Sequence, residues 1–206
     1  MIRHHPSDLT FMNAASGSLP EPHRRVLAVH LAKCRDCAER LHEMQTLGGA
    51  LLDGLPSTAM AADALTRLMA RLDDVPQTPD RDALPAPISL SNLATGRWHW
   101  SGPGIAMMSL IRRDATNSRL DLIRVAPGAA LLEHGHTEFE TTVVLTGAFE
   151  DGHDTFSVGD FAEADGEMKH RPRALVGEEC ICLIATTGHL SARGFLGRLV
   201  RPLLGM

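Results

Sequence analysis

The sequence predicts an α + β protein of two domains, a small helical domain over residues 1–75 and an all-β domain over residues 92–206. Three observations predict this division. Apolar residues recur three and four positions apart in the first part. Prolines then crowd into residues 76–91, which are expected to form a semi-rigid linker. After the linker, short β-favouring runs alternate with glycine-containing turns.

The apolar spacing predicts four helices in the first domain. The first is expected over residues 7–16 and the third over about 36–52. Ser18 to Glu21 resembles a capping box with Ser18 as the N-cap of the second helix. The fourth helix has the clearest apolar stripe, formed by Leu65, Leu68, Met69 and Leu72. Such a stripe is either core, which is the commoner case, or the face that docks into a groove on a partner.

The second domain is expected to be a sandwich or barrel of short strands, because strand-like runs are separated by regularly placed glycines. The predicted strands cover residues 105–111, 119–125, 141–145, 156–158 and 181–185.

Composition excludes several classes of function. The net charge is −5 and the 20 Lys and Arg residues are scattered, which argues against direct DNA binding. The sequence shows no signal peptide and no apolar run that could span a membrane, so a cytoplasmic protein without membrane contact is expected. The four cysteines form two close pairs, 34/37 and 180/182, which indicates metal or redox thiols rather than disulfides.

A group of soft metal ligands lies in the helical domain. His30, Cys34 and Cys37 have the spacing His-x3-Cys-x2-Cys, and they share one side if the helix continues through them. Tetrahedral zinc needs a fourth ligand, which His4 or His5 can supply from the N-terminal arm. Two other interpretations of the Cys-x2-Cys remain open here, a thioredoxin-like redox motif and two packed core cysteines.

A group of harder ligands lies in the β domain. On a regular strand His134, His136, Glu138 and Glu140 would face one side, and His170 could join them from another strand. Histidine and carboxylate ligands suit Zn, Fe, Mn or Ni.

The glycines around these ligands carry a resemblance. The pattern Gly128-x5-His134-x-His136-x3-Glu140-x6-Gly147 is similar to the first sequence motif of the cupins. The second motif keeps Gly159 and His170, whereas Asp165 and Glu167 replace its proline and glycine. The resemblance implies a jelly-roll barrel whose metal ligands are His134, His136, Glu140 and His170.

Taken together, the two groups of ligands resemble the ChrR-type zinc-binding anti-sigma factors, along nearly the whole chain. The opening residues Arg3 to Asp8 and the segment Cys180 to Leu183 add to the similarity. The resemblance implies zinc held by His5, His30, Cys34 and Cys37. It also implies a non-enzyme that inhibits a group IV sigma factor and releases it in response to singlet oxygen or related oxidants.

Two questions remain at the level of sequence. A cupin dioxygenase or isomerase with a helical accessory domain is the alternative function, but it leaves the zinc ligands of the helical domain without a role. Cys180 and Cys182 face the same way on a strand, where they are either a buried pair or a redox pair.

Overall fold

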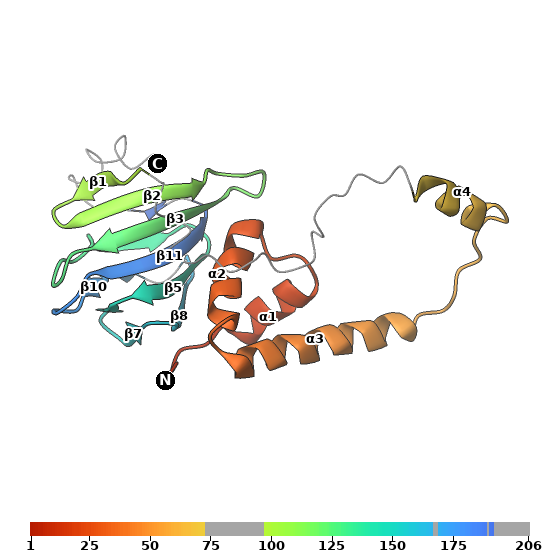
Figure 1. Ribbon diagram of the computed structural model, residues 1–206, viewed down its shortest axis with the longest axis horizontal. Helices are drawn as coiled ribbons and strands as arrows, with labels where there is room; N and C mark the ends of the chain where they lie inside the picture. Colours follow the sequence, from red (N-terminus) through yellow and green to blue (C-terminus); the bar gives the residue numbers. More distant parts are fainter. Residues whose placement is uncertain (73–96, 167–168, 189, 192–206) are drawn as a thin grey trace.

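The computed structural model describes residues 1–72, 97–166, 169–188 and 190–191. A helical part precedes a barrel of antiparallel strands (Figure 1). This order confirms the predicted fold class. The proline-rich segment predicted as a linker, residues 76–91, lies outside the described residues. Among the described residues, no helix has the length and apolar character needed to cross a bilayer.

Four helices form the first part, as predicted: α1 (Asp8–Ala15), α2 (Glu21–Leu31), α3 (Arg35–Asp53) and α4 (Ala64–Arg71). The side chain of Ser7 caps α1 by accepting the N–H of Thr10. The capping box predicted for α2 is wrong, because Pro20 is its N-cap and makes no side-chain cap. Ser18 instead hydrogen bonds to Asn13 at the end of α1.

The α2 helix does not continue through the cysteines, contrary to one assumption made from the sequence. It ends at Leu31, and Cys34 becomes the N-cap of α3. Cys37 then lies in the first turn of α3, so both cysteines stand at the N-terminus of this helix.

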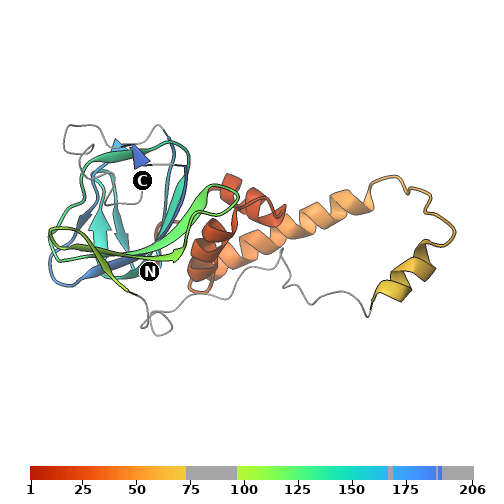
Figure 2. The ribbon, with the colours of Figure 1, turned by 90° about the horizontal axis from the view of Figure 1, so that it is seen from above.

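A six-stranded antiparallel sheet forms one wall of the barrel in the order β1-β2-β3-β11-β5-β8. Its strands are β1 (His99–Gly102), β2 (Ile105–Ile111), β3 (Ser118–Val125), β5 (Glu140–Thr146), β8 (Phe161–Ala164) and β11 (Cys180–Thr187). Two smaller sheets, in the orders β10-β6-β7 and β12-β4-β9, complete the ring of strands seen from above in Figure 2. Their strands are β4 (His134–His136), β6 (Ala148–Glu150), β7 (Thr155–Ser157), β9 (Lys169–His170), β10 (Arg173–Ala174) and β12 (Leu190–Ser191).

Glycine fixes the tight approach of two strands at the end of β5. Gly147 has φ +66, and a Cβ built there would lie 2.6 Å from the carbonyl oxygen of Glu179. No L side chain fits both constraints, which explains why the sequence pattern has glycine at this position.

The large sheet is buried on both faces. Leu120, Leu122 and Leu183 point outward into a core shared with the helices, where Val26 and Leu27 of α2 meet them. The inward face forms a second core within the barrel, made of residues such as Ile123, Val144 and Phe149. Helix α2 therefore lies between α1 and α3 on one side and the sheet on the other, and the two parts of the chain share one core.

Candidate metal centres

The residues predicted to bind zinc in the helical part meet at the junction of that part with the barrel. We call His5, His30, Cys34 and Cys37 the N-terminal cluster, because one ligand atom of each lies within 4.8 Å of the others. His5 Nδ1 is 3.2 Å from Cys37 Sγ and 3.5 Å from Cys34 Sγ. His4 does not take part, since its ring packs against Phe156.

The chemistry of the N-terminal cluster suits a soft cation such as zinc. His30 Nε2 is buried and has no hydrogen-bond partner in the described part of the chain, while His30 Nδ1 donates to the carbonyl of Gly159 at 2.7 Å. Burial, with a further contribution from the hydrogen bond with Cys34, raises the pKa of the Cys37 thiol to about 12. A buried thiolate therefore needs a cation beside it, and the unpartnered imidazole nitrogen faces the same point.

The barrel holds a second group of ligands. We call His134, Glu140 and His170 the barrel cluster, whose ligand atoms also lie within 4.8 Å of one another. From the sequence, residues 134 to 140 were assumed to form one regular strand, but the structure divides them between two strands. His134 belongs to β4, Glu140 begins β5, and Glu138 is exposed between them. His136 also belongs to β4, but its side chain lies outside the described part of the structure.

The three described side chains of the barrel cluster lie close together, and burial favours the neutral form of each. His134 and His170 face each other with their Nε2 atoms 3.1 Å apart, and His134 Nδ1 donates to the carbonyl of Leu132 at 2.8 Å. Burial lowers the pKa of both histidines, that of His170 to about 4 with a further contribution from His134. Neutral imidazoles are the form that binds metals. Burial raises the pKa of Glu140 to about 8, which a cation beside the carboxylate would oppose.

The barrel cluster opens onto a cavity of about 200 Å³ inside the barrel. Its wall is largely apolar, with Ile105, Ile123 and Phe149 among the lining residues. A cavity of about 150 Å³ is enough to hold benzene, so this one has room for a small organic molecule next to the ligands.

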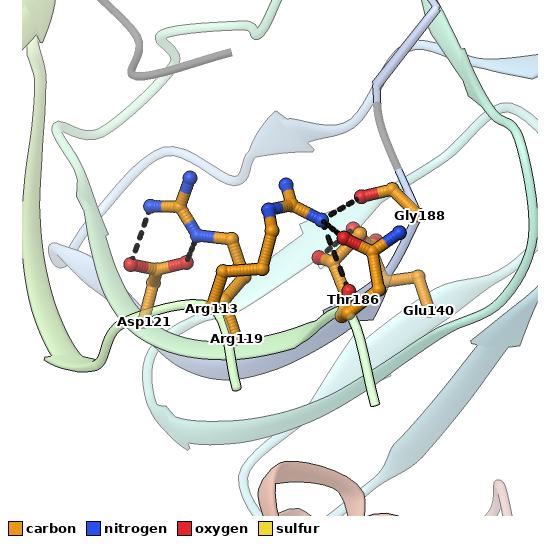
Figure 3. A network of polar contacts seen from close by, with 7 residues as sticks. Arg113, Arg119, Asp121, Glu140, Thr186 and Gly188 are labelled. Carbon is orange, nitrogen blue, oxygen red and sulfur yellow. Dashed lines mark hydrogen bonds and ion pairs between the residues drawn. The ribbon is translucent and has the colours of Figure 1, made fainter. Parts of the chain in front are cut away.

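Two arginines line the same cavity from β3 and the segment before it (Figure 3). Arg119 pairs with Asp121, with Nε 2.5 Å from Oδ2. Arg113 donates to the carbonyl oxygens of Gly188 and Asn117. Thr186 donates to Glu140 Oε2 at 3.3 Å and so helps to hold this carboxylate in place. These arginines could not be predicted from the sequence, because nothing in their spacing relates them to the ligands.

Cys180 and Cys182 line the cavity together, as their spacing on a strand predicted. Their sulfur atoms are 3.7 Å apart. The hydrogen bond between them lowers the pKa of Cys180, whereas it raises that of Cys182, which burial raises further. Of the two thiols that face the space beside the barrel cluster, that of Cys180 is therefore the more acidic.

His23 of α2 is a further buried residue that was not predicted from the sequence. It is fully buried between α2 and the large sheet, with Nδ1 2.9 Å from Thr141 Oγ1 and Nε2 2.8 Å from Thr187 Oγ1. Burial lowers the pKa of His23 to about 4. A histidine on an otherwise apolar helix face was the available signal, but its partners are more than 100 residues away.

Comparison with known proteins identifies the family. Residues 89–191 match the family model of the ChrR cupin-like domain. The anti-sigma-E factor ChrR of Cereibacter sphaeroides is 37% identical over 209 residues, covering 98% of this chain and 97% of that protein. The chain belongs to the ChrR family.

A solved structure extends this similarity to three dimensions. The crystal structure of Rhodobacter sphaeroides SigE in complex with the anti-sigma ChrR contains a chain that is 36% identical and superposes with a TM-score of 0.74. The match covers 90% of this chain and 99% of that chain, so both the helical part and the cupin barrel belong to the shared fold.

Proposed function

We propose that this chain is an anti-sigma factor, in which the helical part binds and inhibits a group IV sigma factor. The observation that carries the proposal is the similarity over 90% of the chain to the ChrR protein seen in complex with SigE. Because a sigma factor acts on RNA polymerase, the proposed place of action is the cytoplasm. The ligand sets proposed are His5, His30, Cys34 and Cys37 for zinc, and His134, His136, Glu140 and His170 for a divalent metal in the cupin.

The apolar surface of the helical part supports this role. Leu65, Leu68, Met69 and Leu72, which we call the α4 stripe, are each 57 to 68% exposed. Helix α4 buries none of its residues against the described part of the chain and stands apart from the other helices in both views (Figures 1 and 2). Of the two interpretations of this stripe, a docking face therefore fits better than a core.

Other helices extend the exposed apolar surface. Leu47, Leu51 and Leu52 of α3 and Leu9 and Met12 of α1 are each more than half exposed. A sigma factor that covers α1, α3 and α4 would remove these side chains from water, at about 1.5–3 kcal/mol for each large side chain fully buried.

The cupin is proposed to be the sensor half, with singlet oxygen or a related oxidant as the signal. Two routes would weaken the hold on sigma. Either a change at the barrel cluster rearranges the cupin and is passed to the helices, or oxidation of Cys34 or Cys37 releases the zinc. The enzyme alternative is the weaker one, because it gives no role to the N-terminal cluster or to the α4 stripe.

The test of sigma binding uses the full chain and group IV sigma factors from the same genome, examined one at a time by co-elution and calorimetry. One of them should form a one-to-one complex with the wild-type chain. Leu68→Ala should weaken that complex about 10-fold, since the variant loses part of one buried leucine. Thr66→Ala, on the same helix but outside the stripe, is the matched control and should bind like the wild type. If none of these sigma factors binds, the proposal is wrong.

A further inference from the structure

The turn between β7 and β8 of the cupin holds the N-terminal arm of the chain. Asp160 is 2% exposed, and its Oδ1 accepts the backbone N–H of Arg3 at 2.6 Å and of His4 at 3.1 Å. Its Oδ2 accepts the N–H of Ser157 at 2.8 Å, which closes the turn itself. One carboxylate thus joins the cupin turn to the arm.

The residues on either side of Asp160 complete this attachment. Phe161 donates its N–H to the carbonyl of His4 at 3.1 Å. Gly159 has φ +90, and a Cβ built there would lie 2.9 Å from the side chain of Ile2, so the arm passes closely over this turn. The residue that follows this pinned segment is His5, the ligand that the arm gives to the N-terminal cluster.

The same turn also orients a second ligand. The carbonyl of Gly159 accepts a hydrogen bond from His30 Nδ1 at 2.7 Å, which leaves the lone pair of Nε2 directed at the cluster. The ring of Phe161 packs edge-on against that of His30, with centroids 5.5 Å apart. Three consecutive cupin residues therefore position two of the four ligands of a site in the helical part.

We propose that Asp160 is a positioning residue through which the cupin sets how tightly the N-terminal cluster retains zinc. The need is specific to His5, because it is exposed and belongs to an arm outside the helices, which holds its conformation only through contacts such as these. Backbone hydrogen bonds to a buried carboxylate restrict the arm to the conformation that places His5 beside Cys34 and Cys37.

The strand that follows Asp160 gives this attachment a second consequence. Ala162, Glu163 and Ala164 of β8 line the cavity beside the barrel cluster. Glu163 also accepts a hydrogen bond from Thr10 at 2.6 Å and from the N–H of Ser7. Residues 162–164 of β8 therefore form part of the cavity wall, while Phe161 at the start of the strand and the turn before it support the proposed zinc ligands. A shift of β8 would move both. By linkage, zinc in the N-terminal cluster equally stabilises the arm on the cupin.

The test compares full-length chains that carry Asp160→Asn or Asp151→Asn. Asp151 is the matched control, because its carboxylate accepts backbone N–H groups in another hairpin turn, those of His153 and Asp154, without touching the arm. Zinc release to an excess of a colorimetric chelator is followed over time. The phase due to the N-terminal cluster is identified by its absence in Cys34→Ser. Hydrogen exchange at the amides of Arg3 and His4 is measured in parallel.

Asp160→Asn should release zinc at least about 10-fold faster than the wild type, with lost protection of both arm amides, because hydrogen bonds to a charged group are weakened. Asp151→Asn should behave as the wild type. Equal release rates for Asp160→Asn and wild type would overturn the proposal, whatever the exchange data show. If Asp160→Asn does not fold, Arg3→Pro decides instead. It removes one arm donor but leaves the turn intact, and unchanged zinc release in that variant would overturn the proposal. These outcomes depend on zinc and not on a sigma factor, so they are separate from the test of sigma binding.

Discussion

The N-terminal cluster and the barrel cluster differ in what surrounds them. The first brings together four ligands, two of them thiols, and sits where α2, α3, the arm and a cupin turn meet. The second has histidine and carboxylate ligands at the edge of a cavity of about 200 Å³. A closed set of four soft ligands is typical of a structural zinc site, whereas a site that faces a cavity leaves room for a further ligand.

This difference separates two tasks within one small chain. Metal at the N-terminal cluster would tie together segments that are far apart in sequence, so that its loss disturbs the helices proposed to bind sigma. Metal at the barrel cluster would meet whatever enters the cavity, so that its loss disturbs the proposed sensing. Of the following three variants, the first two each test one side of that contrast and the third tests the interface between the helices and the sheet, in order from the largest expected effect.

Cys34→Ser should abolish zinc binding at the N-terminal cluster and loosen α1 to α3. Structural zinc contributes about 10–16 kcal/mol in small zinc domains, which is comparable to the whole stability of a typical protein. Zinc content by mass spectrometry and hydrogen exchange in α3 measure the effect. Cys180→Ser also changes a buried cysteine, but in the cupin, and should leave this zinc in place. A Cys34→Ser chain with undiminished zinc and wild-type exchange would remove the structural role.

Glu140→Gln should lower metal affinity of the barrel cluster by at least about 100-fold, because a neutral amide replaces the only described carboxylate of the set. The N-terminal zinc should remain. Competition with a chelator measures both sites on the same sample. The control is Glu138→Gln, whose side chain is exposed between β4 and β5. Loss of metal from both clusters in Glu140→Gln would show that the two sites are not independent.

His23→Gln should reduce the pH dependence of stability. The pKa of His23 is about 4 in the folded chain and about 6.5 when unfolded. As pH falls from 6.5 towards 4, the unfolded chain binds a proton that the folded chain does not, so the free energy of unfolding decreases. At pH 5 this amounts to about 2 kcal/mol.

Urea denaturation of the full chain at pH 7 and pH 5 measures this effect. Between pH 7 and pH 5, the free energy of unfolding of the wild type should fall by about 2 kcal/mol more than that of His23→Gln. His153→Gln, which changes an exposed histidine, is the control and should follow the wild type. An identical pH dependence in His23→Gln and wild type would mean that folding does not lower the pKa of His23.

The sequence predicted which candidate ligands come together better than it predicted the geometry around them. Spacing indicated Cys34 and Cys37, and the resemblance to cupins selected His134, Glu140 and His170; the structure brings the members of each group together. Prediction failed where a tertiary contact replaced a local one. Ser18 bonds back to Asn13 rather than capping α2, and the chain between His134 and Glu140 bends to pass from one sheet to another.

The support given to the ligands could not be predicted in the same way. Asp160 and His23 act through partners more than 100 residues distant, and no periodicity records such contacts. The two histidines of the arm illustrate the limit. His4 and His5 are equivalent in sequence, whereas in the structure the arm is held on the β7–β8 turn with His5 beside the cysteines and the ring of His4 against Phe156.

The position of α2 between the helices and the sheet has a consequence for synthesis of the chain on the ribosome. His30 and Gly159 are separated by 129 residues. At 5–20 residues per second, roughly 6 to 26 s pass between the appearance of the ligand and that of the turn that orients it. During this interval the outer face of α2 lacks the sheet that buries it. A nascent helical half therefore waits until the β7–β8 turn has been made before the N-terminal cluster has its full support.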